Sequence, residues 1–205
     1  MEFHNDIARF IGCEPALEIK IVPNEPDENF ARKKILKIKN FLTIGIHPGA
    51  RLPLKCFPPE KFAEALNLIL REYRVKLYIF CCDSDLRRGM NIKSAIKDSE
   101  VEFIKDLSIR ELASCIAELD LFLCNDSAPM HIASAFNIPT IAVFGPSDSR
   151  ETGPLSQLNR VIEIPIKCRE KCDENSCFNT SYHACMTMIN PEDIANAFSS
   201  LQKSL

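Results

Sequence analysis

A short turn between an apolar run and a helix of small residues carries the most informative side chains. The segment reads Asn125-Asp126-Ser127-Ala128-Pro129-Met130-His131. Asn125 or Asp126 is expected to cap the helix, which leaves backbone N–H groups near Ser127 and the positive end of the helix dipole to receive a phosphate. His131 lies one turn into the helix and faces either that phosphate or the packed interior. Ordinary capping also explains such a turn, so the residues alone indicate an anion site without identifying its ligand.

Other polar residues follow the remaining apolar runs. His47 comes directly before Pro-Gly and is expected to shape that loop, while Lys55 is either a site cation or a solvated loop lysine. Asp83 and Asp85 follow VKLYIFCC, and either could accept hydrogen bonds from ribose hydroxyls. Ligands of parallel sheets bind at the carboxyl ends of strands, so the candidate stretches are 47–55, 83–87, 125–131 and 145–153.

Four of the ten cysteines cluster in residues 168–185, which we call the Cys-rich segment: Cys168, Cys172, Cys177 and Cys185. Four thiolates are enough for a tetrahedral zinc or iron site, with a structural role because no open ligand position is implied. Free thiols and disulfides are the alternatives, and His183 could replace one of the thiolates. The other six cysteines are scattered, several inside apolar runs where a thiol behaves as a small hydrophobic group.

The elements that must position these residues alternate along the chain. Buried strands are expected at FLTIGIH, VKLYIFCC, VEFI, DLFLCND, PTIAVFG and VIEIPI. Helices are expected from Pro59, over 86–98, from Ser108 with Glu111 completing a capping box, over 127–136, and from Asn190. This alternation predicts an α/β fold with a doubly wound, Rossmann-like parallel sheet.

Composition narrows the protein's class. The 205 residues, 46% hydrophobic and 26% charged, suit one soluble α/β domain. A net charge of −3 gives no general attraction to polyanions, which argues against nucleic acid as a partner. No apolar run approaches the roughly 20 residues of a spanning helix, and the N-terminus has no signal-peptide pattern. The sequence therefore predicts a cytoplasmic protein.

Residues 1–40 fit the alternation less well than residues 41–205. We interpret 1–40 as a linker and the remnant of a preceding domain, and 41–205 as the folded domain. A basic stretch in this region contains Arg32, Lys33, Lys34, Lys37 and Lys39. We expect it to form a solvated helix face, with peripheral contact at the inner face of the cytoplasmic membrane as the alternative.

The stretch NDSAPMHIASAFNIPTIAVFGPSD resembles the signature of glycosyltransferase family 9, the ADP-heptose:lipopolysaccharide heptosyltransferases. Three further stretches agree with that family in order and approximate spacing: IGIHPGARLPLKCFPPEKF, the acidic CCDSD after a strand, and the closing CMTMINPEDI. The resemblance covers about residues 40–201. It implies a GT-B glycosyltransferase, of which this chain corresponds to the C-terminal, donor-binding half.

The resemblance also implies roles for individual residues. Gly49 and Ala50 would offer backbone N–H groups to the diphosphate of a nucleotide sugar, and Lys55 would place its ammonium beside the leaving phosphate. Asp126 corresponds to the family's acidic residue near the transferred sugar. Ser127 and Ala128 would bind phosphate at the helix start. Charge that grows on the leaving diphosphate is then stabilised by groups already aimed at it, so the chemistry requires no divalent metal.

The sequence departs from the family pattern in two residues and in extent. Ala128 stands where Gly is common, which adds a methyl group at a close backbone approach, and Phe57 replaces a Trp. The family's N-terminal domain, with the acceptor site and the general base, has no counterpart here. Some members of the wider group carry a comparable four-cysteine finger.

These observations predict a donor domain that binds ADP-heptose or a similar nucleotide sugar for inverting transfer to a lipopolysaccharide-type acceptor. Alone it is expected to bind donor without appreciable turnover. The alternatives are a non-catalytic nucleotide-binding module and a small metal-finger protein that binds a partner through the Cys-rich segment.

Overall fold

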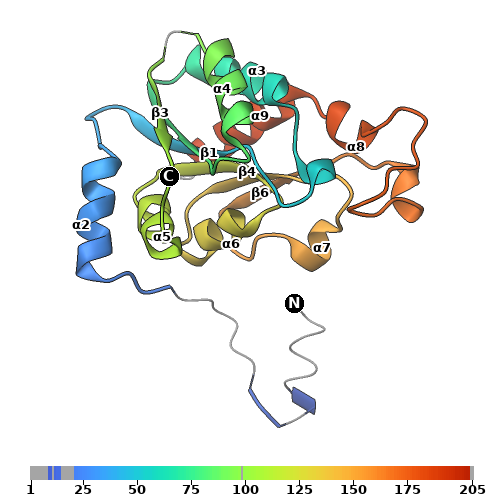
Figure 1. Ribbon diagram of the computed structural model, residues 1–205, viewed down its shortest axis with the longest axis horizontal. Helices are drawn as coiled ribbons and strands as arrows, with labels where there is room; N and C mark the ends of the chain where they lie inside the picture. The colour runs from blue at the N-terminus through green and yellow to red at the C-terminus, as the bar shows by residue number, and fades with distance from the viewer. Residues whose placement is uncertain (1–8, 11, 15–20, 98, 204–205) are drawn as a thin grey trace.

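A single parallel sheet organises the chain. The computed structural model describes residues 9–10, 12–14, 21–97 and 99–203, and its strand order is β3-β2-β1-β4-β5-β6 (Figure 1). The strands are β1 (Leu42–His47), β2 (Val75–Phe80), β3 (Val101–Ile104), β4 (Leu121–Asn125), β5 (Thr140–Val143) and β6 (Asn159–Ile162). All five strand pairings are parallel. The doubly wound α/β class expected from the sequence is therefore confirmed.

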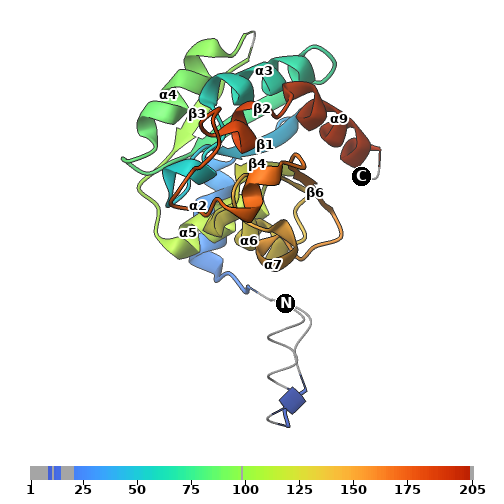
Figure 2. The same cartoon turned by 90° about the vertical axis from the view of Figure 1, so that its right-hand side faces the viewer.

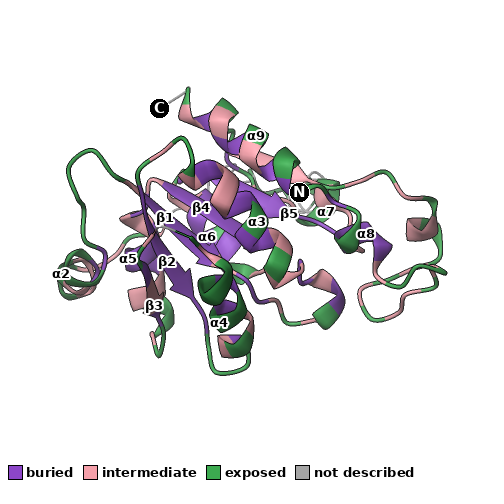
Figure 3. Cartoon of the chain, turned by 90° about the horizontal axis from the view of Figure 1, so that it is seen from above, coloured by how far each residue is buried: buried purple, intermediate pink, exposed green. Residues whose placement is uncertain are grey.

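Helices cover both faces of the sheet (Figures 1 and 2). One face carries α3 (Pro59–Leu70), α4 (Leu86–Ala95) and α9 (Pro191–Gln202), and Figure 3 shows them above the buried strands. The other face carries α2 (Glu25–Lys34), α5 (Ile109–Ala117) and α6 (Ala128–Ala135). The remaining elements are short: η1 (Pro53–Lys55), α7 (Ser149–Thr152), η2 (Lys167–Glu170) and α8 (Ala184–Thr187).

The strands are apolar on both sides because both sides are covered. All six residues of β2 are buried, and they alternate between the two cores. Leu77 and Ile79 belong to the core under α3 and α9, whereas Tyr78 and Phe80 belong to the core under α2 and α5. This explains why β2 is hydrophobic on both of its faces, with Lys76 as its single charged residue.

Local signals place the helix starts. The Ser108 side chain accepts a hydrogen bond from the Glu111 N–H, and the Glu111 carboxylate accepts one from the Ser108 N–H, so the predicted capping box is present. Helix α3 begins at Pro59 and α9 at Pro191, where the missing N–H of proline costs nothing. Asn190 caps α9 through the Glu192 N–H, as the sequence indicates.

Two expected boundaries shift. The last strand is Asn159–Ile162, shorter and earlier than VIEIPI, because β5 offers only four residues to pair with. Ile164 and Ile166 leave the strand but still pack against the core. The folded unit also begins before residue 41, since Ala31 and Ile35 are buried with Tyr78 in the core under α2. The proposed domain remnant falls largely on residues 1–8, 11 and 15–20, outside the described residues.

The basic stretch is divided between α2 and the loop that follows it. Arg32, Lys33 and Lys34 occupy the exposed last turn of α2, where positive charge complements the helix dipole. Lys37 lies beyond the helix and pairs with Asp120 at 2.6 Å.

In the part of the chain that the structure describes, no helix is both long and apolar enough to cross a membrane.

The strand order reverses between β1 and β4. Chain connections run outward from β1 through β2 to β3, and then return to place β4 on its other side. Loops that leave β1 and β4 at this point separate toward opposite faces of the sheet, which opens a crevice at their carboxyl ends. The residues after His47 and Asn125 therefore meet at one edge of the sheet.

Candidate functional site

A cleft of about 560 Å³ opens at this reversal point. Its walls come from the ends of β1, β2 and β4 with the loops that follow them, from the first turn of α6, and from one residue of α7. The lining residues are His47, Ala50, Arg51, Leu52, Lys55, Cys82, Ser84, Asp85, Asp126, Ser127, Ala128, Pro129, His131 and Thr152. The candidate residues of three separate stretches of sequence thus share one cavity.

The Asn125 side chain holds the loop after β1 in place through hydrogen bonds to its backbone. This side chain is fully buried and donates to the carbonyls of Pro48 at 2.9 Å and Gly49 at 3.2 Å. Its carbonyl oxygen accepts from the Phe57 N–H at 3.0 Å. Both ends of the loop that carries Lys55 are therefore tied to one side chain at the end of β4.

Lys55 and Asp126 form the charged centre of the cleft. The Lys55 Nζ lies 2.8 Å from Asp126 Oδ2, and the two side chains are 13% and 6% exposed. The Ser147 hydroxyl donates to the same carboxylate oxygen at 2.5 Å, which fixes Asp126 from the opposite side. The sequence motif thus places an ammonium beside a buried carboxylate at the mouth of α6.

Lys55 has a second carboxylate partner. Glu174, from the Cys-rich segment, places Oε1 2.5 Å from the Lys55 Nζ. Burial works to lower the pKa of Lys55, but its hydrogen bonds and charge interactions with Asp126 and Glu174 outweigh burial and raise that pKa above 10.5. Lys55 is therefore a permanent cation in the cleft.

The front of α6 is open to the cleft. Ser127 is the N-cap residue and no side chain caps the helix, so the expectation that Asn125 or Asp126 would cap it is wrong. Both side chains have other partners: Asn125 donates to the backbone of the β1 loop, and Asp126 pairs with Lys55 and accepts a hydrogen bond from Ser147. Among the described contacts, the N–H groups of Ser127 and Ala128 donate to no other residue, which leaves them for a ligand.

His47 supports the same helix start. Its Nδ1 lies 3.1 Å from the Ser127 hydroxyl, which also donates to the Asn125 carbonyl. Burial lowers the pKa of His47 below 6.5, against the opposing charge of Asp85. His47 is therefore neutral at physiological pH and positions Ser127 besides shaping the Pro-Gly loop.

Gly49 and Asp85 are packed so closely that only glycine fits. A Cβ on Gly49 would lie 2.2 Å from the Asp85 carboxylate carbon. Asp85 is buried and lines the cleft, where the Cys82 thiol donates to it at 3.2 Å. Asp83, the other candidate for the ribose hydroxyls, is exposed and is not among the lining residues. The geometry thus favours Asp85 for that role.

The remaining candidates lie at the rim. Ala128 and His131 are exposed on α6, and Ala50 is half-buried on the opposite wall. The N–H groups of Gly49 and Ala50, like those of α6, have no acceptor among the described residues. Phe57, which stands where the family has Trp, is fully buried edge-on against Phe62 at a centroid distance of 5.0 Å.

The four clustered cysteines belong to the Cys-rich segment, the orange and red loops near α8 in Figure 1, and all four are free thiols. The amides of Phe178 and His183 donate to the sulfurs of Cys172 and Cys177 at 3.2 and 3.3 Å. The Phe178 amide works to lower the pKa of Cys172, but burial and the neighbouring Cys168 outweigh it and raise that pKa. Donation from the His183 amide also lowers the pKa of Cys177.

These thiols do not form a ready-made metal site. Within residues 21–97 and 99–203 and the short described stretches before them, no three His, Cys, Asp or Glu side chains are arranged to hold a metal ion. His183, the expected substitute ligand, instead places its Nε2 2.8 Å from the Leu54 carbonyl. That contact connects the Cys-rich segment to the loop that carries Lys55.

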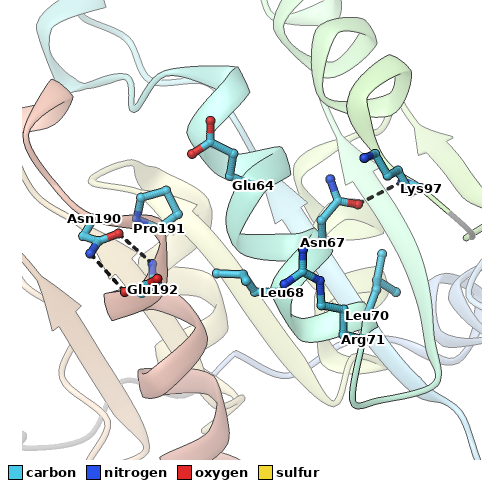
Figure 4. A pocket seen from close by; sticks show the side chains of 9 residues that line it. All are labelled: Glu64, Asn67, Leu68, Leu70, Arg71, Lys97, Asn190, Pro191 and Glu192. Carbon is cyan, nitrogen blue, oxygen red and sulfur yellow. Dashed lines mark hydrogen bonds between the residues drawn. The ribbon is translucent and has the colours of Figure 1, made fainter.

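A second pocket lies between α3 and the start of α9 (Figure 4). Its polar groups are largely engaged with the backbone: Asn67 contacts the Lys97 N–H and the Ala95 carbonyl, and Asn190 caps α9. Glu64 and Glu192 add negative charge. This pocket lies on the α3 and α9 face of the sheet, away from the open helix start and the cleft cation.

Sequence reasoning missed three residues that organise the cleft. The sequence indicates Asn125 or Asp126 as a helix cap and carries no sign that Asn125 binds the β1 loop. Ser147 lies in the stretch after β5 that was marked for inspection, so its position was the available signal. Nothing in the sequence connects Glu174 with Lys55, because they lie far apart in the chain and belong to different motifs.

The fold and the cleft are those of a doubly wound α/β domain whose cleft opens at the strand-order reversal. The sequence model for glycosyltransferase family 9 (heptosyltransferase) matches residues 14–183. This chain therefore belongs to glycosyltransferase family 9. A relative in Campylobacter jejuni, lipooligosaccharide heptosyltransferase 2, is 34% identical over 159 residues, covering 74% of this chain and 48% of the relative.

Solved structures agree with the fold assignment. The Escherichia coli ADP-heptose lipopolysaccharide heptosyltransferase II superimposes with a TM-score of 0.72 at 24% identity, covering 91% of this chain and 54% of that one. A family 9 glycosyltransferase from Veillonella parvula superimposes with a TM-score of 0.80 at 18% identity, covering 100% and 60%. The chain spans about half the length of the curated relatives it matches.

One structural neighbour is described as containing iron. The glycosyltransferase TibC of enterotoxigenic E. coli, an iron-containing dodecamer, superimposes with a TM-score of 0.62 at 13% identity, covering 98% of this chain and 53% of TibC. At this identity the likeness concerns the fold.

Proposed function

We propose that this chain is the donor-binding half of a heptosyltransferase that transfers a heptose from ADP-heptose to a lipopolysaccharide-type acceptor with inversion. One observation carries the proposal. Lys55 is held against Asp126 at 2.8 Å, directly before a helix start whose N–H groups are free. An ammonium and free amides that converge on one cleft are a binding site for a diphosphate.

Each residue group has a role in this reaction. The amides of Gly49, Ala50, Ser127 and Ala128 hold the diphosphate, and Lys55 neutralises the charge that grows on it as the glycosidic bond breaks. Asp126 orients Lys55 and faces the transferred sugar. These groups are fixed before the reaction, so their interactions strengthen as charge develops. Asp85 accepts hydrogen bonds from the ribose, and His131 lies at the phosphate end of the cleft.

Calorimetric titration with ADP tests the proposal. The wild-type chain should bind ADP, and Lys55→Ala should weaken binding at least about tenfold, because a charge-assisted hydrogen bond contributes about 1.5–3 kcal/mol. Lys33→Ala is the matched control, since Lys33 is an exposed lysine on α2. Absence of ADP binding at millimolar concentration, with Asp126→Ala making no difference, would refute the proposal.

Transfer to acceptor separates the enzyme from a non-catalytic nucleotide-binding module. With ADP-heptose and a lipopolysaccharide-core acceptor, we expect donor binding but negligible transfer by this chain alone. Transfer should appear when an acceptor-binding half from a relative is supplied in trans. Donor binding without transfer under any such pairing would instead favour the binding module.

We also propose that the Cys-rich segment takes up a structural zinc or iron ion. Four thiols gather there, and backbone N–H groups already donate to two of the sulfurs, a contact that stabilises thiolates. The side chains would have to rotate to complete a tetrahedral set. Elemental analysis of the purified chain should find about one metal ion per chain, and Cys172→Ser should remove it. Metal-free protein in which Cys168, Cys172, Cys177 and Cys185 all react with a thiol reagent would refute the assignment.

A further inference from the structure

Glu174 is not among the lining residues of the cleft, but it contacts the cleft lysine in a way that the proposed chemistry does not use. It lies between Cys172 and Cys177, and its carboxylate meets the ammonium of Lys55 at 2.5 Å. The lining residues of the cleft include Arg51 and Lys55, and Glu174 contacts Lys55, the more buried of these two basic residues. Any diphosphate that approaches Lys55 must therefore contend with a carboxylate already present.

The two carboxylates on Lys55 are held differently. Asp126 is 6% exposed and is fixed by the Ser147 hydroxyl as well as by Lys55. Glu174 is 35% exposed, and among the described contacts its carboxylate has Lys55 as its one partner. Rotation of the Glu174 side chain into solvent thus breaks a single contact, whereas displacement of Asp126 would expose a buried charge.

The backbone that presents Glu174 is well ordered by its own turn. The Asp173 carboxylate accepts from the amides of Asn175 and Ser176, each at 2.7 Å, and the Asp173 N–H donates to the Ser176 carbonyl. His183 holds the same segment to the Lys55 loop through the Leu54 carbonyl at 2.8 Å. The carboxylate is consequently delivered to Lys55 by a fixed turn, and its side chain is free to leave.

We propose that Glu174 is a stand-in for the donor diphosphate: it occupies Lys55 when the cleft has no nucleotide and is displaced when a nucleoside diphosphate binds. The inference rests on the proposed function, because it assigns a competitor for the same cation. Asp126 and Glu174 already share this ammonium, so a diphosphate that binds Lys55 competes with the less firmly held carboxylate, Glu174. Donor binding thereby becomes coupled to the Cys-rich segment.

Glu174→Gln tests the inference by removing the charge and keeping the shape. ADP should bind the variant about three- to tenfold more tightly, because the displaced contact no longer competes. Glu170→Gln is the matched control, since it removes an exposed acidic charge from the same region without touching Lys55, and its ADP affinity should stay at the wild-type value. Equal or weaker ADP binding in Glu174→Gln would overturn the inference.

A second measurement does not depend on ADP. In the nucleotide-free chain, the rate of Lys55 acylation by an amine-reactive ester, followed by peptide mass spectrometry, should rise in Glu174→Gln and stay unchanged in Glu170→Gln. If wild-type protein fails to bind ADP but Lys55 acylation rises as expected, the proposed function fails and the contact is real. If ADP binds, Lys55→Ala abolishes binding and Glu174→Gln changes neither readout, the function stands and the stand-in role fails.

Discussion

The turn after β4 and the Cys-rich segment both reach Lys55, but they are held in place by different means. At the turn, Asn125 is fully buried and makes three side-chain hydrogen bonds to the loop backbone. In the Cys-rich segment the residues up to His183 are exposed or half-buried, and they reach the loop through Glu174 and the His183 ring. The first region is built into the core, whereas the second is attached to its surface.

This difference indicates which contacts can be exchanged during binding. Breaking a buried hydrogen bond leaves an unsatisfied polar group, whereas breaking an exposed ion pair returns both partners to water. We therefore expect the β4 turn to keep its contacts when a ligand binds. We expect the contacts of the Cys-rich segment with the Lys55 loop to be the ones that a ligand can replace. Four substitutions test that contrast, in order of decreasing expected effect.

Asn125→Ala should produce the largest loss. It leaves the Phe57 N–H and the carbonyls of Pro48 and Gly49 without partners inside the domain, which should lower the free energy of unfolding by about 2–4 kcal/mol. Urea denaturation measures the change. Asn67→Ala is the control, because Asn67 also makes two side-chain-to-backbone hydrogen bonds but does so near the surface. A loss no greater than that of the control would remove the distinction between the regions.

Gly49→Ala should lower the free energy of unfolding by about 1–3 kcal/mol, as overpacking does. The added methyl group would overlap the Asp85 carboxylate, which lies 2.2 Å from the Cβ position. Combining the change with Asp85→Ala should recover most of the loss, so thermal unfolding of the double variant measures the clash directly. Additive losses in the double variant would show that Asp85 is not the obstacle.

His47 should make stability dependent on pH. Burial lowers its pKa in the folded chain below 6.5, so the unfolded chain binds this proton more readily. The contribution is fully present above about pH 6.5 and is lost as the pH falls, with a slope of at most about 1.4 kcal/mol per pH unit. Urea denaturation at several pH values should show a shallower decline for His47→Asn. A decline in His47→Asn as steep as that of wild type would show that another group is responsible.

His183→Asn should have the smallest effect, below about 1 kcal/mol in the free energy of unfolding. Asparagine tolerates the left-handed backbone at this position, where φ is 61°, so the change mainly removes the ring contact with Leu54. Chemical denaturation again provides the measurement. A loss as large as that of Asn125→Ala would show that the Cys-rich segment is as integral to the domain as the β4 turn.

Much of the fold could be predicted from the sequence because its signals are local. The apolar run of β2, the Ser108 capping box and the prolines at α3 and α9 each determine their own element. The extent of β6 and the packing of α2 could not be predicted in this way, since each depends on a neighbour in space. Ala31 is buried because Tyr78 and α5 are present, not because of the residues beside it.

The location of the candidate site could be predicted from the sequence, because its lining residues follow the carboxyl ends of the strands. Residues of the stretches after β1, β2 and β4 do line one cleft, and their roles remain proposals. The cap assigned to Asn125 or Asp126 was wrong because tertiary partners compete for those side chains more strongly than the helix start does. Glu174 could not be found from sequence, since an ion pair between distant segments leaves no local pattern.

The contact between His183 and Leu54 joins residues 129 positions apart in the chain. During synthesis on the ribosome, all lining residues of the cleft are present once Thr152 has been added. Glu174 and His183, which contact the loop that carries Lys55, are added later. The closing helix α9, which packs against α3, follows last of all. A nascent chain at this stage therefore has Asp126 as the carboxylate partner of Lys55, and Glu174 and the helix that completes the core are added only afterwards.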